Sequence, residues 1–274
     1  MPLDAQRARR RAAPSCRRYP PRLHGPGIRA SLSAAGRSGD RPYYRRGGSH
    51  PLAPSEKGLL SPAVFLPVLE ISSIAVDVGR WILDTACAFA GELATSGYPV
   101  RMGVNLFAAQ LRDQAFTADV LSALARNRLP AHLLELEITE TTVLGVDADT
   151  LQPLQALRAG GVGIAFDDYG TGFASLSLLK KYPLTRLKID REFVRDIEKD
   201  PDDAAIVEAV LAMGRSLRLE VIAEGMETQA QADILKQLRC SEAQGYLFGK
   251  PMPADEFRSR IARKLDARAR VAPV

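Results

Sequence analysis

The chain has 274 residues, 46% of them hydrophobic, which is enough to build the core of one large domain or two small ones. No run approaches the roughly 18 consecutive apolar residues of a membrane span, so we expect no membrane segment. The three cysteines, Cys16, Cys87 and Cys240, are far apart in the sequence. This spacing fits neither a metal site nor a redox pair, and it favours a reducing, cytoplasmic setting.

The formal net charge of +5 is unevenly distributed. Residues 1–50 contain 12 Arg and 2 Asp without any Lys or Glu, whereas the remainder contains 25 basic and 30 acidic residues. We expect residues 1–54 to be a mostly disordered segment rich in Arg, Pro and Gly. A solvated tail, a nucleic-acid-binding arm and a transit peptide are alternatives for this segment. Because the rest of the chain is mildly acidic, we expect no nucleic acid partner.

Beyond residue 60, strand-like runs of β-branched and apolar residues alternate with amphipathic, helix-like stretches. In chain order the predicted elements are a helix at 81–93, strands at 100–106 and 133–139, a helix at 149–159, strands at 162–168 and 185–190, a helix at 202–217, a strand at 219–225, a helix after Thr228 and a strand at 241–248. Thr228 and Gln231 have the form of a capping box. This alternation predicts βα units around a largely parallel sheet, either a barrel or a doubly wound sheet.

Each predicted strand ends in polar or charged side chains, which are Asn105, Glu137, Asp167 with Asp168, Lys188, Glu224 and Gln244. In a TIM-type barrel such ends meet at one face, where the active site is built. Taken singly, each residue has an ordinary explanation as a helix cap, a solvated loop residue or an ion-pair partner. Together they favour a single cleft. Oxygen ligands of this kind suit Mg²⁺ or Mn²⁺, and carboxylates that hold two such ions are typical of phosphodiester hydrolysis.

The motifs around these residues resemble those of the EAL domain family, the bacterial cyclic di-GMP phosphodiesterases. The resemblance covers about residues 55–262 and leaves 263–274 as a C-terminal tail. The motifs that carry it are GLLSPAVFLPVLE (58–70), GVNL (103–106), LELEITET (134–141), DDYGTGFASLSLL (167–179), LKIDREFV (187–194), VIAEGMET (221–228) and QGYLFGKPM (244–252).

The resemblance implies a modified TIM (β/α) barrel of EAL type that hydrolyses cyclic di-GMP to the linear dinucleotide pGpG with two Mg²⁺ or Mn²⁺ ions. It also implies roles for individual side chains. The implied metal ligands are Asn105, Glu137, Asp167 and Asp168; Glu224 and Lys188 would handle the attacking water and its protons, and Gln244 would line the site. Glu140 would anchor the 168–176 loop, which in this family links the metal site to the dimer interface, so a homodimer through this region is implied; Asp190 and Glu227 would be supporting polar contacts.

The family's first strand and its Glu-Ala-Leu segment should precede residue 55, and neither is present, so we expect a barrel that is incomplete at its N-terminus. The codons of residues 30–54, read in a frame offset by one base, permit the string LHYQPLVDLATGRITGAEALIRWRH. This string resembles the missing segment, with its glutamate opposite Gly47. Our hypothesis is that residues 1–54 are an out-of-frame translation, which would remove one metal ligand and impair turnover. The alternative function is an inactive domain that binds cyclic di-GMP or a protein.

Overall fold

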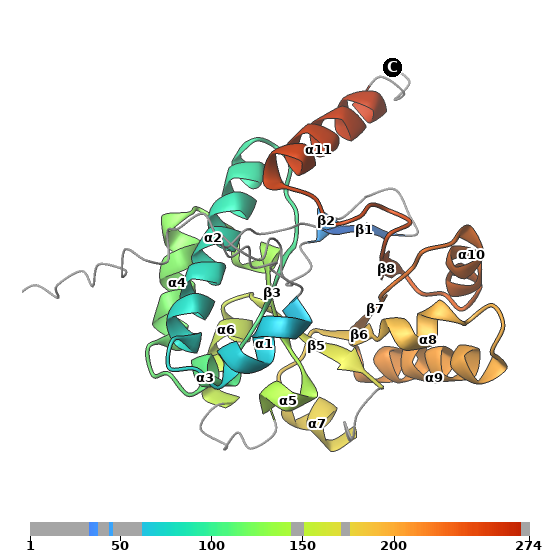
Figure 1. The fold of residues 1–274 in the computed structure, drawn as a ribbon, viewed down its shortest axis with the longest axis horizontal. Helices are drawn as coiled ribbons and strands as arrows, with labels where there is room; N and C mark the ends of the chain where they lie inside the picture. Colours follow the sequence, from blue (N-terminus) through green and yellow to red (C-terminus); the bar gives the residue numbers. More distant parts are fainter. Residues whose placement is uncertain (1–32, 38–43, 46–61, 144–150, 171–175, 270–274) are drawn as a thin grey trace, which may run out of the picture.

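The computed structural model describes residues 33–37, 44–45, 62–143, 151–170 and 176–269. Its centre is a curled eight-stranded sheet in the order β2-β1-β8-β7-β6-β5-β4-β3 (Figure 1). The strands are β1 Ser33–Arg37, β2 Tyr44–Arg45, β3 Met102–Asn105, β4 Leu134–Ile138, β5 Gly163–Tyr169, β6 Arg186–Ile189, β7 Glu220–Ala223 and β8 Glu242–Gln244.

Strands β3 to β8 are parallel, and each pairs with the next strand along the chain. A doubly wound sheet reverses its strand order at a switch point, and this run of six strands has no such reversal. The sequence left open a barrel or a doubly wound sheet, and the strand order decides for the barrel. All six strands predicted from the sequence are confirmed, with bounds that differ by a few residues at their ends.

Helices connect and cover the strands. They are α1 Pro62–Glu70, α2 Ala75–Thr95, α3 Ala108–Leu111, α4 Phe116–Arg126, α5 Glu140–Val143, α6 Leu151–Ala159, α7 Leu176–Lys181, α8 Arg191–Arg195, α9 Pro201–Leu217, α10 Gln229–Gln237 and α11 Ala254–Ala269. Helix α2 packs against β3 and α4, α6 packs against β5, and α9 packs against β6 and β7 (Figure 1). The capping box that precedes α10 is present, with Thr228 accepting from the backbone of Gln231.

Strand β4 shows how the two faces of the sheet differ. All five of its residues are buried. Because side chains alternate along a strand, Leu134, Leu136 and Ile138 share one face, and Glu135 and Glu137 share the other. The three aliphatic side chains belong to the main hydrophobic core. The glutamates therefore point to the inside of the curled sheet, where polar residues gather.

Two strands fall within the segment that we expected to be disordered. Residues Ala35 to Arg37 of β1 pair antiparallel with Gln244 to Glu242 of β8, so this edge of β8 is covered. Strand β2 pairs with β1 and lies close to β3, at the opposite edge of the sheet. The rest of residues 1–54, including Gly47, lies outside the described residues.

The C-terminal boundary also differs from the expectation. Helix α11 continues to Ala269, through the domain end placed at residue 262. Helix α6 is described from Leu151, and residues 149–150 of its predicted range lie outside the described residues.

Burial raises the pKa of the Cys87 thiol to about 12 and that of Cys240 to about 11, which keeps both thiols protonated at neutral pH. Within the described ranges, none of the helices combines the length and apolar character that crossing a bilayer would require.

Candidate active site

The polar residues singled out in the sequence gather at the C-terminal ends of the parallel strands. Asn105 and Gln244 are the last residues of β3 and β8, Glu137 and Lys188 are the penultimate residues of β4 and β6, and Glu224 directly follows β7. Asn105 is the register partner of Glu137. Parallel strands bring these ends to one edge of the sheet, which is the active-site face of βα barrels.

Lys188 lies at the centre of the cluster. Its Nζ is 3.1 Å from Glu137 Oε2, 2.5 Å from Asp167 Oδ1 and 2.5 Å from Glu224 Oε1. The Lys188 side chain is only 3% exposed, so these contacts form away from bulk water. Gln244 Nε2 donates to Glu224 Oε1 at 2.5 Å and joins β8 to the same cluster. One ammonium group thus faces three carboxyl groups.

The adjacent acids of β5 both face this cluster because the strand is irregular there. In a regular strand, neighbouring side chains point to opposite faces. The register between β5 and β6 shifts between Phe166 and Tyr169, and Asp168 has a left-handed φ of 54°. A bulge of this kind re-aims side chains, and aspartate tolerates the left-handed region better than most residues. Carboxylate oxygens of Asp167, Asp168 and Glu224 consequently lie within 4.8 Å of one another.

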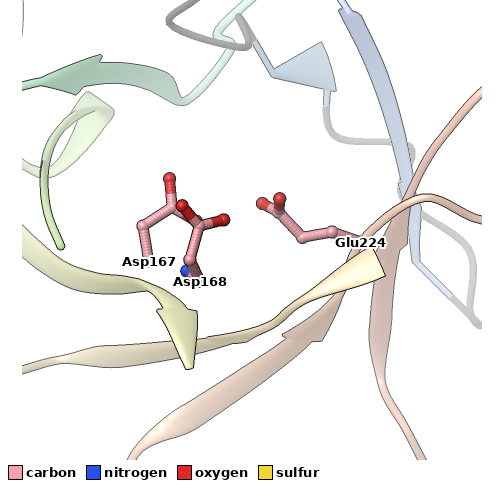
Figure 2. Close-up of side chains that lie close together, drawn as sticks. All are labelled: Asp167, Asp168 and Glu224. Atoms are coloured by element: carbon pink, nitrogen blue, oxygen red, sulfur yellow. The ribbon is translucent and has the colours of Figure 1, made fainter. Parts of the chain in front are cut away.

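Figure 2 shows the carboxyl groups of Asp167 and Asp168 side by side, with Glu224 pointing toward them from the end of β7. Such crowding disfavours ionisation. Burial, followed by repulsion from Glu224, raises the pKa of Asp167 to about 8, although Lys188 acts in the opposite direction. Partial desolvation, followed by repulsion from Asp167 and a hydrogen bond with Asp190, raises the pKa of Asp168 to about 7. The cluster therefore carries more carboxyl groups than its single lysine neutralises.

The donor set fits a hard divalent cation. Besides the carboxylates, the Oδ1 atom of Asn105 and the Oε1 atom of Gln244 are buried and find no hydrogen-bond partner among the described residues. Buried carbonyl oxygens without a partner are unusual, and oxygen atoms are the ligands that Mg²⁺ and Mn²⁺ prefer. Close carboxylates with raised pKa values and buried amide oxygens are thus available to such an ion.

The three residues expected to support the site, Asp190, Glu140 and Glu227, differ in how near they lie to the carboxylate cluster. Asp190 caps α8, accepting from the backbone of Glu192 at 2.7 Å, and it also contacts Asp168. Glu140 is the first residue of α5, just beyond β4, but its expected partner segment includes residues 171–175, which lie outside the described residues. Glu227 is exposed in the loop that leads to α10, and its backbone N–H donates to Gln231 Oε1 at 2.7 Å.

Two features near the site were not found from the sequence. Gly245 follows Gln244, and a Cβ at this position would lie 2.1 Å from the carbonyl oxygen of Met226, so β8 approaches the loop after β7 only with glycine there. Arg186 lies two residues before Lys188 on β6 and is almost completely buried among glutamates. The sequence signal for the buried Arg186 is that both LELEI and RLKI carry two charged residues separated by one leucine.

The barrel-like parallel sheet, with clustered carboxylates at its C-terminal edge, defines a βα-barrel domain with a candidate site for divalent cations. The EAL domain family model matches residues 52–251. The chain therefore belongs to the EAL domain family.

Relatives of known sequence support this membership. The chain is 44% identical over 210 residues to the Pseudomonas aeruginosa protein MucR, named as a bifunctional diguanylate cyclase/cyclic di-GMP phosphodiesterase, and the match covers 76% of this chain and 30% of MucR. It is 37% identical over 203 residues to the Bacillus subtilis signaling protein YkoW, covering 74% of this chain and 25% of YkoW. The chain thus matches less than a third of the length of either relative.

Solved structures share the fold. A structure described as the PaMucR phosphodiesterase in complex with c-di-GMP superposes with a TM-score of 0.77 at 37% identity, covering 84% of this chain and 94% of the other. The EAL enzyme Bd1971, in its form bound to cAMP and cyclic di-GMP, superposes with a TM-score of 0.80 at 27% identity, covering 86% of this chain and 65% of the other.

Proposed function

We propose that this chain is a phosphodiesterase domain that hydrolyses cyclic di-GMP to pGpG with two Mg²⁺ or Mn²⁺ ions. The observation that carries the proposal is the cluster of carboxyl groups around Lys188 at the ends of neighbouring parallel strands. MucR is named as a cyclic di-GMP phosphodiesterase, and MucR and Bd1971 have both been solved with cyclic di-GMP bound, which supports the choice of substrate.

The proposed metal ligands are Asn105, Glu137, Asp167 and Asp168. The carboxyl groups of the two aspartates are adjacent, and the amide oxygen of Asn105 has no partner among the described residues. A bound pair of divalent cations would polarise the scissile phosphate and lower the pKa of a water molecule. All four residues stand at or near the C-terminal ends of β3, β4 and β5, and ligands on ordered strand ends would lose little conformational entropy on binding an ion.

Lys188 and Glu224 are the proposed groups that hold the attacking water and its protons. Glu224 Oε1 accepts from both Lys188 and Gln244, so its carboxyl group is oriented by two donors. A carboxylate held in this way can accept a proton, and a neighbouring ammonium can donate one, provided that both reach the substrate. The direct contact between the two side chains allows a proton to pass between them.

The N-terminal segment is the reason to propose impaired activity. The family match begins at residue 52, so it leaves out nearly all of this segment. We propose that residues 1–54 are an out-of-frame translation and that the family's first glutamate is absent as a result. Sequencing the encoding DNA tests this: the hypothesis fails if the offset frame does not encode LHYQPLVDLATGRITGAEALIRWRH.

The enzyme and its alternative, a receptor that binds cyclic di-GMP without hydrolysis, are separated by one assay. Purified chain is incubated with cyclic di-GMP and Mn²⁺, and products are resolved by chromatography. We expect slow formation of pGpG, abolished by EDTA and by Asp167→Asn, whereas Asp233→Asn, on α10, serves as a control carboxylate exchange. Saturable binding without product would support the receptor. A cytoplasmic location, which rests on the cysteine spacing, and a homodimer formed through residues 168–176, which rests on the family resemblance, are also proposals.

A further inference from the structure

The inside of the sheet carries two successive layers of polar side chains. Glu137, Lys188 and Gln244 form the layer at the candidate active site. Two residues earlier on the same strands, and therefore on the same face, lie Glu135, Arg186 and Glu242. Inner positions of βα barrels usually hold branched apolar side chains in such layers. Here the layer beneath the site is ionic instead.

Arg186 is the centre of the lower layer. Its Nε lies 3.2 Å from Glu135 Oε2, its Nη1 lies 2.5 Å from Glu242 Oε2, and its Nη2 pairs with Glu220. The side chains of Arg186, Glu135 and Glu242 are at most 6% exposed. Arg101, just before β3, lies 3.2 Å from Glu220 and within 4.0 Å of the other two glutamates. The layer therefore connects β4, β6, β7 and β8.

Small residues on β5 make these connections feasible. Strand β5 lies between β4 and β6, so a glutamate of β4 must pass over β5 to reach a cation on β6. The β5 residues opposite Glu135 and Glu137 are Gly163 and Ala165. A Cβ on Gly163 would lie 3.3 Å from Glu135 Cγ, so the Glu135 side chain already fills the space beside this glycine. The same arrangement recurs one layer higher, where Glu137 passes Ala165 to reach Lys188.

We propose that Arg186 is a positioning residue for the candidate active site. By pairing with Glu135 and Glu242 it holds β4, β6 and β8 at fixed separations directly beneath Glu137, Lys188 and Gln244. A planar guanidinium group with several donors suits this role better than a point charge would. The inference rests on the proposed function, because it assigns Arg186 to the site that would hold the metal ions.

The test compares Mn²⁺ affinity, measured by isothermal titration calorimetry, between wild type and variants of the full chain. Arg186→Met removes the charge and keeps the length of the side chain. Arg186→Lys keeps the positive charge but loses the planar guanidinium group with its several donors. The matched control is Arg80→Met on α2, because Arg80 also pairs with three carboxylates, those of Asp77, Asp113 and Asp119, but on the outside of the sheet. All measurements are made where circular dichroism shows each protein to be folded.

We expect Arg186→Met to weaken Mn²⁺ binding about tenfold, because Arg186 holds the strands that carry the proposed ligands without touching the ligands, and loss of direct ligand partners costs about 10- to 100-fold. Arg186→Lys should recover part of this loss, and Arg80→Met should bind Mn²⁺ like wild type, although both arginine-to-methionine variants lower thermal stability. Folded Arg186→Met that binds Mn²⁺ as tightly as wild type would overturn the inference, as would an equal loss in Arg80→Met.

If Arg186→Met does not fold, Gly163→Ala replaces it. The added Cβ displaces Glu135 from Arg186 without removing any charge, and we expect about a threefold loss of affinity; an unchanged affinity would overturn the inference. A wild-type chain that binds Mn²⁺ but forms no pGpG would contradict the proposed function alone, because the affinities still decide the role of Arg186. Absence of Mn²⁺ binding by wild type would overturn both.

Discussion

At the scale of single residues, the adjacent acids Asp167 and Asp168 have an explanation in backbone geometry. A regular strand would send one carboxyl group inward and the other outward. The irregular register and the positive φ of Asp168 bring both toward Glu224. Burial, followed by the repulsion between these carboxyl groups, raises the pKa values of both aspartates. Any cation that enters would therefore stabilise the ionised form of both carboxyl groups, and the ammonium group of Lys188 already supplies one positive charge.

Replacing Lys188 with methionine tests its central position. The variant leaves Glu137, Asp167 and Glu224 without their shared ammonium group, so we expect the free energy of unfolding in EDTA to fall by roughly 3 kcal/mol, measured by urea denaturation. Product formation should fall roughly 10²–10³-fold, since a group that handles protons is lost. Lys180→Met, at an exposed position of α7, should leave both quantities unchanged. An active Lys188→Met enzyme would contradict the assigned role.

The pH dependence of the metal-free protein follows from Asp167. Its folded pKa of about 8 exceeds the ordinary aspartate pKa of 3.8 expected in the unfolded chain, so between these values the folded state binds more protons. The free energy of unfolding should consequently fall as the pH rises from about 4 to about 8 and level off above, and Asp168 acts in the same direction.

Thermal melts in EDTA between pH 5 and pH 9 measure this slope. Asp167→Asn should flatten it, and Mn²⁺ should stabilise the wild type most at high pH, where fewer protons compete for the carboxylates. A melting temperature that rises with pH in EDTA would contradict the assignment.

At the scale of elements, the helix ends combine favourable and unfavourable local geometry. Helix α9 begins well, with Asp200 as N-cap and Pro201 in the first turn. It ends with Arg218 in the left-handed region, at φ 59° and ψ 34°, where glycine is the usual residue. The fold tolerates this strain because the helix packs against β6 and β7, and its buried face includes Val207, Val210 and Leu211.

Substituting Arg218 with glycine should therefore stabilise the protein. We expect an increase of about 0.5–1 kcal/mol in the free energy of unfolding, measured with urea, because glycine adopts this conformation without a Cβ penalty. The matched change Arg215→Gly, within the last turn of α9, should instead lower stability by about 1 kcal/mol. Equal effects of the two substitutions would show that the left-handed geometry is not what matters.

At the scale of the whole molecule, the N-terminal strand β1 has a weaker strand-forming sequence than the parallel strands of the sheet. Strand β1 covers the edge of β8, yet its five residues, SAAGR, include two alanines and a glycine, which have low β propensity. The six parallel strands, in contrast, are rich in buried aliphatic side chains. A segment with stronger strand character at this edge should hold the barrel together better.

Replacing residues 30–54 with LHYQPLVDLATGRITGAEALIRWRH tests this at the level of the entire chain. We expect a higher melting temperature, because the new segment puts leucine and valine in place of Ala35 and Gly36 of β1. We also expect at least tenfold faster pGpG formation, because it restores the glutamate that the family resemblance implies as a metal ligand. The control is the same replacement with that glutamate, opposite Gly47, changed to glutamine, which should keep the stability and lose the gain in rate. No gain in either quantity would count against the out-of-frame origin.

Much of the fold could be predicted because it is encoded locally. Strand and helix positions follow from periodicity, and the capping box before α10 follows from Thr228 and Gln231. The residues of the candidate site could be named because parallel βα units place strand ends at one face. The pairing of β1 with β8 could not be predicted, since SAAGR has no strand-like pattern. Arg186 was missed because a charged residue early in a strand resembles a solvated strand end.

The sequence by itself determined the family, the order of the elements and the set of polar residues that end the strands, because each of these is written in short motifs and local periods. The tertiary structure alone decided which of those residues touch. Lys188 meets Glu137 across β5, where the small residue Ala165 lies between them, and Asp168 joins Asp167 where β5 is irregular. Contacts between strands depend on register and on the space left by intervening side chains, and neither quantity is a property of any single stretch of sequence.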